Sequence, residues 1–427
     1  MANDGRRLRD RRLILLLAVL GVAAGIALAV PVGSRQHVGD DFHVFWQAGR
    51  NFATGAPLYH DSLPGARPLK YPPFAAMVFV PLALFPLPVA GVVMSLVNLA
   101  LWVAAVWLTC EILRRTGPPG RLRLALGLGF ILSAQYFLDN FHHVQMNEVT
   151  FVLALIGIKA YLDGRDVAAA AAFVAATAIK LTPIFFVAWL VIRGGRRATL
   201  AAVALAIACV VVPLVLRGPS RGVDELREYY HVFLEKHQRG EVESYTAGQN
   251  IAALVSRATV APEESGGESY RWAPTTERTA QVLYRGLWIA VLLLFLGRLV
   301  WLRVRRAPVT AAEPAMVFAT ALLLSPITFT THLVPLLYIF AAVLSVPLGR
   351  LGIATRVLAA LIGVGMLVCG LSGRDLVGGA LYLAVGGYSI CAWTLLALFG
   401  VTLVWSGRAT PHPERSEGPS SPSSSYG

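Results

Sequence analysis

The sequence predicts an all-α polytopic membrane protein. Hydrophobic residues make up 56% of its 427 positions and charged residues only 14%, which leaves too little polar surface to cover a soluble domain. The apolar residues are gathered into long segments, and short basic clusters recur between them, as they do in cytoplasmic loops. The formal net charge of +13 therefore indicates orientation in a membrane and not nucleic-acid binding.

The first apolar segment, residues 13–32, is long enough to span a bilayer and follows a cluster of arginines. Its N-terminal end is thus expected in the cytoplasm, and residues 33–72 form a first external loop. An amphipathic helix is expected to start at Asp41 in this loop and to end at Gly55, lying on the membrane surface. Asp41 could cap this helix, act in catalysis, or do both.

Residues 73–86 are apolar, but they are too few to cross a membrane and include Pro81, so we expect a re-entrant segment. An Ala-rich hairpin, residues 167–179 and 183–192, has two legs that are short for a crossing and should pack inside the bundle. Residues 217–280 form a long external loop, with helical turns expected near residues 224–236. The remaining spans are expected at residues 88–113, 124–138, 149–162, 201–216, 281–301, 314–324, 333–348, 357–371 and 381–405.

This pattern gives roughly ten to twelve transmembrane helices, with both termini in the cytoplasm. We expect a single transmembrane domain over residues 1–405 and a disordered cytoplasmic tail over residues 406–427, which are rich in Pro, Ser and Gly. The four cysteines lie in apolar runs and lack metal-ligand spacing, so they are interpreted as core residues.

The predicted topology brings the polar residues that a membrane protein usually avoids to the outer face, where they become functional candidates. Each also has a simpler explanation: Lys180 could reach from a helix end to the headgroups, and the histidines could be structural. The position of Lys180 between two unusually short helices favours an anion site. The candidates are Asp40, Asp41, Lys70, His142, His143, Gln145, Asn147, Lys180, Gln249, Asn250 and His332.

Four stretches follow one another in a characteristic order and spacing: the Asp41 helix with Tyr71-Pro-Pro-Phe74, Gln145-Met-Asn147, Lys180-Leu-Thr-Pro183, and Ser325-Pro-Ile-Thr-Phe-Thr-Thr-His332. Together they resemble the motifs of glycosyltransferase family 87, the membrane enzymes that use polyprenyl-phosphate sugars. Val144 stands where the family has a Gly, and Thr331 where it has the first of two histidines. A further Asn-Gln-Ser motif is matched weakly at Gln249-Asn250, with Gly248 at the Asn position.

The resemblance implies a GT-C type bundle with its site at the outer face, and an inverting transfer of a sugar, most typically mannose, to a hydroxyl of a glycolipid or cell-envelope glycan. It implies Asp41 as the general base, with Asp40 as the fallback. Lys180, His332, His142 and His143 would bind the donor phosphate, and Tyr71, Gln145, Asn147, Gln249 and Asn250 the substrates. No cofactor and no metal is implied.

Two alternatives remain open. A lipid or sugar transporter or flippase would use the same buried polar residues as a path, although it would need a second cluster at the inner face. A lipid-linked glycan ligase would rely on a long external loop rich in Arg and His. The partners expected are a polyprenyl-phosphate sugar, a glycolipid or glycan acceptor and membrane lipids. The expected localisation is the bacterial plasma (inner) membrane, as a multi-pass protein whose active site faces the periplasm or exterior.

Overall fold

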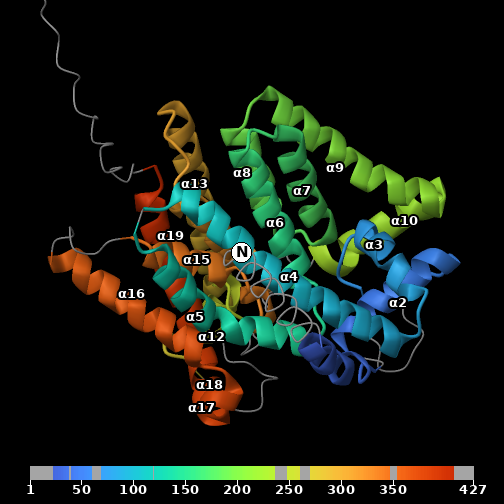
Figure 1. Cartoon of the computed structure of the whole chain (residues 1–427), viewed down its shortest axis with the longest axis horizontal. Helices are drawn as coiled ribbons and strands as arrows, with labels where there is room; N and C mark the ends of the chain where they lie inside the picture. The colour runs from blue at the N-terminus through green and yellow to red at the C-terminus, as the bar shows by residue number, and fades with distance from the viewer. Residues whose placement is uncertain are drawn as a thin grey trace, which may run out of the picture.

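The computed structural model describes residues 23–37, 40–59, 69–118, 120–235, 248–259, 270–346 and 353–407. Within these ranges the regular structure is helical and contains no strand, which confirms the predicted all-α class (Figure 1). The expected tail from residue 406 lies almost wholly outside the described residues. The helices are α2 (Asp41–Thr54), α3 (Pro73–Ala83), α4 (Leu87–Thr116), α5 (Leu122–His142), α6 (Asn147–Leu162), α7 (Asp166–Ile179), α8 (Ile184–Arg193), α9 (Arg196–Arg217), α10 (Pro219–Tyr229), η1 (Tyr230–Leu234), α12 (Ile251–Thr259), α13 (Glu277–Val304), α14 (Ala312–Leu324), η2 (Thr330–Leu333), α15 (Leu336–Leu344), α16 (Ile353–Leu371), α17 (Arg374–Val377), α18 (Gly379–Gly387) and α19 (Ile390–Trp405).

Four helices in the described ranges, α4, α5, α9 and α13, are long and apolar enough to cross a membrane, and the bent pair α18–α19 makes a fifth candidate. Shorter apolar helices of 10–17 residues fill the space between them. The chain is thus a multi-pass membrane protein. Residues 381–405, which we expected to form one continuous helix, are bent by 48°. The bend lies at Ser389, whose φ of +57° is left-handed, and the buried Arg257 donates to its hydroxyl.

The predicted amphipathic helix is α2, which ends at Gly55 with a φ of +76°. Its apolar face, including the buried Phe42 and Phe45, packs on α3, the short apolar helix expected to re-enter the membrane. Gly49 makes this packing close, because a Cβ there would lie 2.6 Å from the backbone carbonyl of Phe79. In Figure 1 α2 and α3 lie side by side, beyond the end of α10.

The two short hairpin legs, α7 and α8, are packed inside the bundle as predicted. Phe173, Phe186 and Trp189 are buried side chains of this hairpin and contact each other's rings. At the inner end of α8, Arg193 forms a buried ion pair of 2.7 Å with Glu313 of α14, and the Trp189 indole donates to the same carboxylate. Such a pair is stable only when its other hydrogen bonds are satisfied, and here they are.

The basic clusters mark one end of the bundle. Arg115 at the end of α4 and Lys159 of α6 both bind Asp163, which follows α6. Asn147 begins α6 at its other end. A helix of 16 residues is about 24 Å long, so Asn147 and the residues around it lie about that far from Asp163, toward the other end of the bundle.

The expected helical turns near residues 224–236 are present as α10 and the π-helix η1. Arg217, at the end of α9, forms a buried ion pair with Glu225 of α10. It also donates to the carbonyls of Asn51, Phe52 and Ala56 at the end of α2. These contacts therefore hold the start of the segment that follows α9 against the end of α2, the helix that begins at Asp41.

Candidate active site

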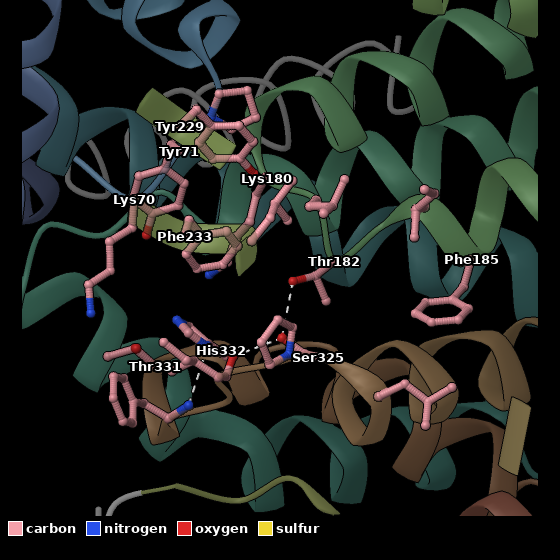
Figure 2. Close-up of a pocket in the computed structure, with 18 of the residues that line it drawn as sticks. Lys70, Tyr71, Lys180, Thr182, Phe185, Tyr229, Phe233, Ser325, Thr331 and His332 are labelled. Carbon is pink, nitrogen blue, oxygen red and sulfur yellow. Dashed lines mark hydrogen bonds between the residues drawn. The ribbon is translucent and has the colours of Figure 1, made fainter. Parts of the chain in front are cut away.

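A cavity of about 730 Å³ lies between α2, α8, α13 and the loop that joins α14 to η2. In Figure 2, Lys70, Tyr71 and Lys180 lie on one side of the open space, and Ser325, Thr331 and His332 lie on the other. Its lining combines apolar side chains with a few charged ones, as in sites that bind amphipathic ligands.

Asp41 lines this cavity from the first turn of α2. The interpretation of Asp41 as the helix cap is wrong, because Asp40 occupies the N-cap position. The Gln145 amide donates a hydrogen bond of 2.6 Å to the Asp41 carboxylate. The Gln145 backbone carbonyl in turn accepts from Asn98 of α4 at 3.0 Å, which fixes the segment that carries the amide.

The turn before Gln145 explains a feature of the motif. Val144 has a φ of +48° and is fully buried. This left-handed backbone suits glycine and strains a β-branched residue. The Gly found here in family 87 would adopt it without strain, whereas Val144 fills the adjoining core with its side chain.

Lys180 lies in the extended break between α7 and α8 and lines the same cavity. Its ammonium donates to the Asn147 side-chain oxygen at 2.6 Å and stands 5.9 Å from the centre of the Tyr71 ring. Burial lowers the pKa of Lys180 to about 7, and the charge of Asp41 opposes this effect. The cavity thus holds a carboxylate and an ammonium that interact electrostatically.

His332 lies across the cavity from Lys180. Its Nδ1 is 3.2 Å from the Phe329 backbone nitrogen and 3.1 Å from the Ile327 carbonyl, so the loop holds the ring in place. Burial, with a smaller contribution from Lys180, lowers the pKa of His332 well below its usual value. The empty site therefore has a neutral imidazole, which an arriving anion would help to protonate.

Six predicted site residues lie outside the lining of this cavity, and Asp40, His142 and His143 are three of them. Asp40 is exposed, and its carboxylate accepts from the His37 backbone nitrogen at 2.7 Å. His142 is also exposed. His143 pairs with Asp139 at 3.2 Å, and this hydrogen bond raises the pKa of His143 to about 9.

Gln249 and Asn250 are buried and support the loop before His332. Asn250 donates to the carbonyls of Ser325 and Pro326 at 2.7 and 2.8 Å. The Gln249 backbone nitrogen donates to the Thr328 carbonyl at 2.6 Å. Tyr71 and Gln145 line the cavity, and Asn147 borders a smaller one behind Lys180 and His332.

Sequence reasoning missed two contributions. Arg285 lines the cavity from α13, and a charged residue inside a predicted span is a signal that could have indicated it. Asp139 accepts from the Thr330 hydroxyl at 2.6 Å, next to Thr331 in the cavity wall. Nothing in the spacing of Asp139 and Thr330 predicts that contact, because 191 residues separate them.

A second, almost wholly apolar cavity of about 300 Å³ lies between α3, α7, α9 and α10. It shares Pro72, Leu181, Ile184 and Tyr229 with the first cavity. Helix α9, on its outer side, buries only three of its residues and exposes long apolar side chains. In the described part of the chain, no three His, Cys, Asp or Glu side chains are grouped as metal ligands would be.

A helical membrane bundle with a charged cavity that adjoins an apolar one defines a class of protein that handles amphipathic, lipid-linked ligands at one membrane face. The model of glycosyltransferase family 87 matches residues 69–326, more than half of the chain. The chain belongs to this family, and the resemblance drawn from its motifs is confirmed.

Two relatives are similar over most of the chain. One, from Mycobacterium tuberculosis, is a polyprenol-phosphate-mannose-dependent alpha-(1-2)-phosphatidylinositol mannoside mannosyltransferase, 26% identical over 67% of this chain. Its namesake from Mycolicibacterium smegmatis is 25% identical over 68% of this chain. The matches span 64% and 66% of the relatives' own lengths. A crystal structure of ArnT from Cupriavidus metallidurans bound to undecaprenyl phosphate superposes with a TM-score of 0.43, covering 92% of this chain and 78% of that chain at 15% identity.

Proposed function

We propose that this chain is a mannosyltransferase that moves mannose from a polyprenyl-phosphate donor to a hydroxyl of a glycolipid or cell-envelope glycan. The observation that carries the proposal is the placement of Asp41 and Lys180 in one cavity, where a side-chain amide, that of Gln145 or Asn147, orients each of them. The names of the two mycobacterial relatives support the donor and the sugar.

The chemistry requires a base and an anion site. Asp41 takes the proton of the acceptor hydroxyl as its oxygen attacks the anomeric carbon. The bond from that carbon to the phosphate oxygen breaks, and its electron pair leaves with the polyprenyl phosphate. Lys180 stabilises the departing phosphate. His332, which takes up a proton from solvent when the anionic donor binds, acts beside it, since both groups lie in a site of low dielectric constant. One direct displacement inverts the anomeric carbon, so a β-linked donor gives an α-linked product.

The cavities suggest where the lipids lie. The apolar cavity beside α3 shares four lining residues with the charged cavity, and its apolar walls suit the polyprenyl chain. The charged cavity lies at the end of the bundle opposite the basic clusters, which supports a reaction at the outer, periplasmic face of the plasma membrane. Gln145 and Asn147 act through Asp41 and Lys180, and Asn250 acts through the loop that carries His332.

The test uses membranes that contain the full chain, radiolabelled polyprenyl-phosphate mannose and a mixed lipid extract as acceptor. Wild type and Asp40→Asn should transfer label, whereas Asp41→Asn should be slower by about 10²–10⁴-fold. Equal transfer by all three proteins would remove Asp41 from the reaction. If a panel of polyprenyl-phosphate sugars gave no transfer above empty membranes, the transferase would be rejected, and lipid translocation would be measured in its place.

A further inference from the structure

Behind Lys180, a row of buried polar side chains leads away from the cavity. The Asn147 side-chain nitrogen donates to the Asn140 side-chain oxygen at 3.0 Å, while its oxygen accepts from Lys180. Asn140 interacts in turn with the carboxyl group of Glu148. Asn140, Asn147 and Glu148 are 0%, 4% and 1% exposed, so water does not compete for these contacts.

The row has a fixed polarity because its two ends differ. An ammonium can only donate, so Asn147 must turn its oxygen toward Lys180 and its nitrogen toward Asn140. Asn140 then accepts with its oxygen and is left with its nitrogen as a donor. Among the described residues, neither that nitrogen nor the Oε2 atom of Glu148 has a hydrogen-bond partner within the usual distance and angle, although the two side chains are close enough for Asn140 to act on the Glu148 carboxyl group. A buried amide donor and a buried carboxyl oxygen complete each other.

We propose that Glu148 is a positioning residue, which orders the Asn140 and Asn147 amides so that an oxygen faces Lys180 and holds its ammonium charged in the cavity. This role rests on the proposed function only for its consequence, which is binding of the donor phosphate. Glu148 can affect Lys180 without touching it, because the hydrogen bonds of a buried chain polarise one another.

The groups that act on Lys180 from other elements are Asp41 of α2 and His332 of η2, and the Tyr71 ring faces it from the loop before α3. Removing Glu148 leaves all three in place but takes away the partner of the Asn140 nitrogen, so the Asn147 oxygen is held less firmly toward Lys180. Loss of one charge-assisted hydrogen bond should lower the pH at which Lys180 loses its proton by about one unit.

The test measures the titration of Lys180 directly, on the full chain in nanodiscs without substrate. Competitive acetylation with acetic anhydride across a pH series, read by mass spectrometry, gives the midpoint for each of the four lysines. Glu148→Leu should lower the Lys180 midpoint by about one pH unit, whereas Glu148→Gln, which retains an acceptor oxygen, should leave it near that of wild type. Lys159, bound to Asp163 at the far end of α6, is the internal control and should not shift.

An unchanged Lys180 midpoint in Glu148→Leu, or equal shifts in Glu148→Leu and Glu148→Gln, would overturn the proposal. If Glu148→Leu does not fold, Asn140→Ser takes its place, because the shorter serine side chain cannot bridge Asn147 and Glu148. Asn140→Ser should then lower the Lys180 midpoint in the same way, and an unchanged midpoint would overturn the proposal. The titration does not require mannose transfer. A failure of the Glu148 proposal can therefore be told apart from a failure of the proposed transferase activity. With active enzyme, Glu148→Leu should raise the donor KM at pH 8 and leave it near wild type at pH 6.

Discussion

The Gln145 side chain donates a 2.6 Å hydrogen bond to the carboxylate of Asp41, across 104 residues of sequence. Two residues further on, Asn147 accepts from Lys180 at the same distance. One short segment at the start of α6 therefore sets both charged groups of the cavity. The proposed base and the proposed phosphate-binding group are oriented by side chains only two residues apart.

Replacing Gln145 should impair the proposed base without removing it. Gln145→Leu deprives the Asp41 carboxylate of its donor and lets the side chain leave the orientation that the reaction needs. We expect kcat to fall about 10- to 100-fold, because a charge-assisted hydrogen bond contributes about 1.5–3 kcal/mol. Transfer assays at saturating donor measure this. A normal kcat in Gln145→Leu would show that Asp41 does not depend on Gln145.

Donor binding should weaken as the pH rises through about 7. Burial places the pKa of Lys180 at about 7, so its ammonium is present below this pH and is lost above it. The value of kcat/KM for the donor should therefore fall by up to about tenfold per pH unit on the alkaline side. Lys180→Arg keeps its charge to much higher pH, so the fall of kcat/KM on the alkaline side should disappear in this variant. An unchanged alkaline limb in Lys180→Arg would exclude Lys180 as its cause.

Val144 offers a test of backbone strain. Val144→Gly and Val144→Ala both lose the packing of the buried side chain, but only glycine relieves the left-handed φ of +48°. Val144→Gly should therefore be more stable than Val144→Ala by about 1 kcal/mol. Thermal unfolding of both variants in the same detergent gives this difference. Greater stability of the alanine variant would mean that the turn is not strained.

The pair of Arg217 and Glu225 should matter mainly for stability. Both side chains are almost fully buried, at 2% and 4% exposure. Arg217→Met leaves three carbonyls of the α2 region without their donor and the buried Glu225 carboxylate with only the more exposed Arg221, at 3.3 Å, which should cost about 3–5 kcal/mol. The double variant Arg217→Met/Glu225→Gln should recover part of this loss in thermal unfolding. A double variant less stable than Arg217→Met would show that the Glu225 charge is compensated elsewhere.

The sequence was most informative about the helices. Segment length and the periodic pattern predicted α2, the hairpin α7–α8 and the long apolar helices, because apolar burial in a bilayer follows composition directly. The break at Ser389 was harder to predict. Gly386 and Gly387 lie just before it, but the left-handed φ falls on Ser389, whose hydroxyl accepts from Arg257, 132 residues away.

For the site, motif resemblance identified Asp41, Tyr71, Gln145, Lys180 and His332, which line one cavity. It could not separate them from Asp40, His142 and His143, which are adjacent in sequence and of the same chemical types. Only the three-dimensional arrangement shows that these neighbours point elsewhere. The apolar cavity beside α3 could not be located from the sequence, because its lining comes from helices that are far apart in sequence.

The most direct measurement separates donor binding from transfer in purified protein. Binding of labelled polyprenyl-phosphate mannose to nanodiscs should be retained by Asp41→Asn and lost by Lys180→Met, because of these two residues only Lys180 contacts the phosphate in our account. In a single turnover with acceptor present, wild type should form product, whereas Asp41→Asn should hold the donor without forming it. Rapid product formation by Asp41→Asn, or tight donor binding by Lys180→Met, would contradict the assignment of these two residues.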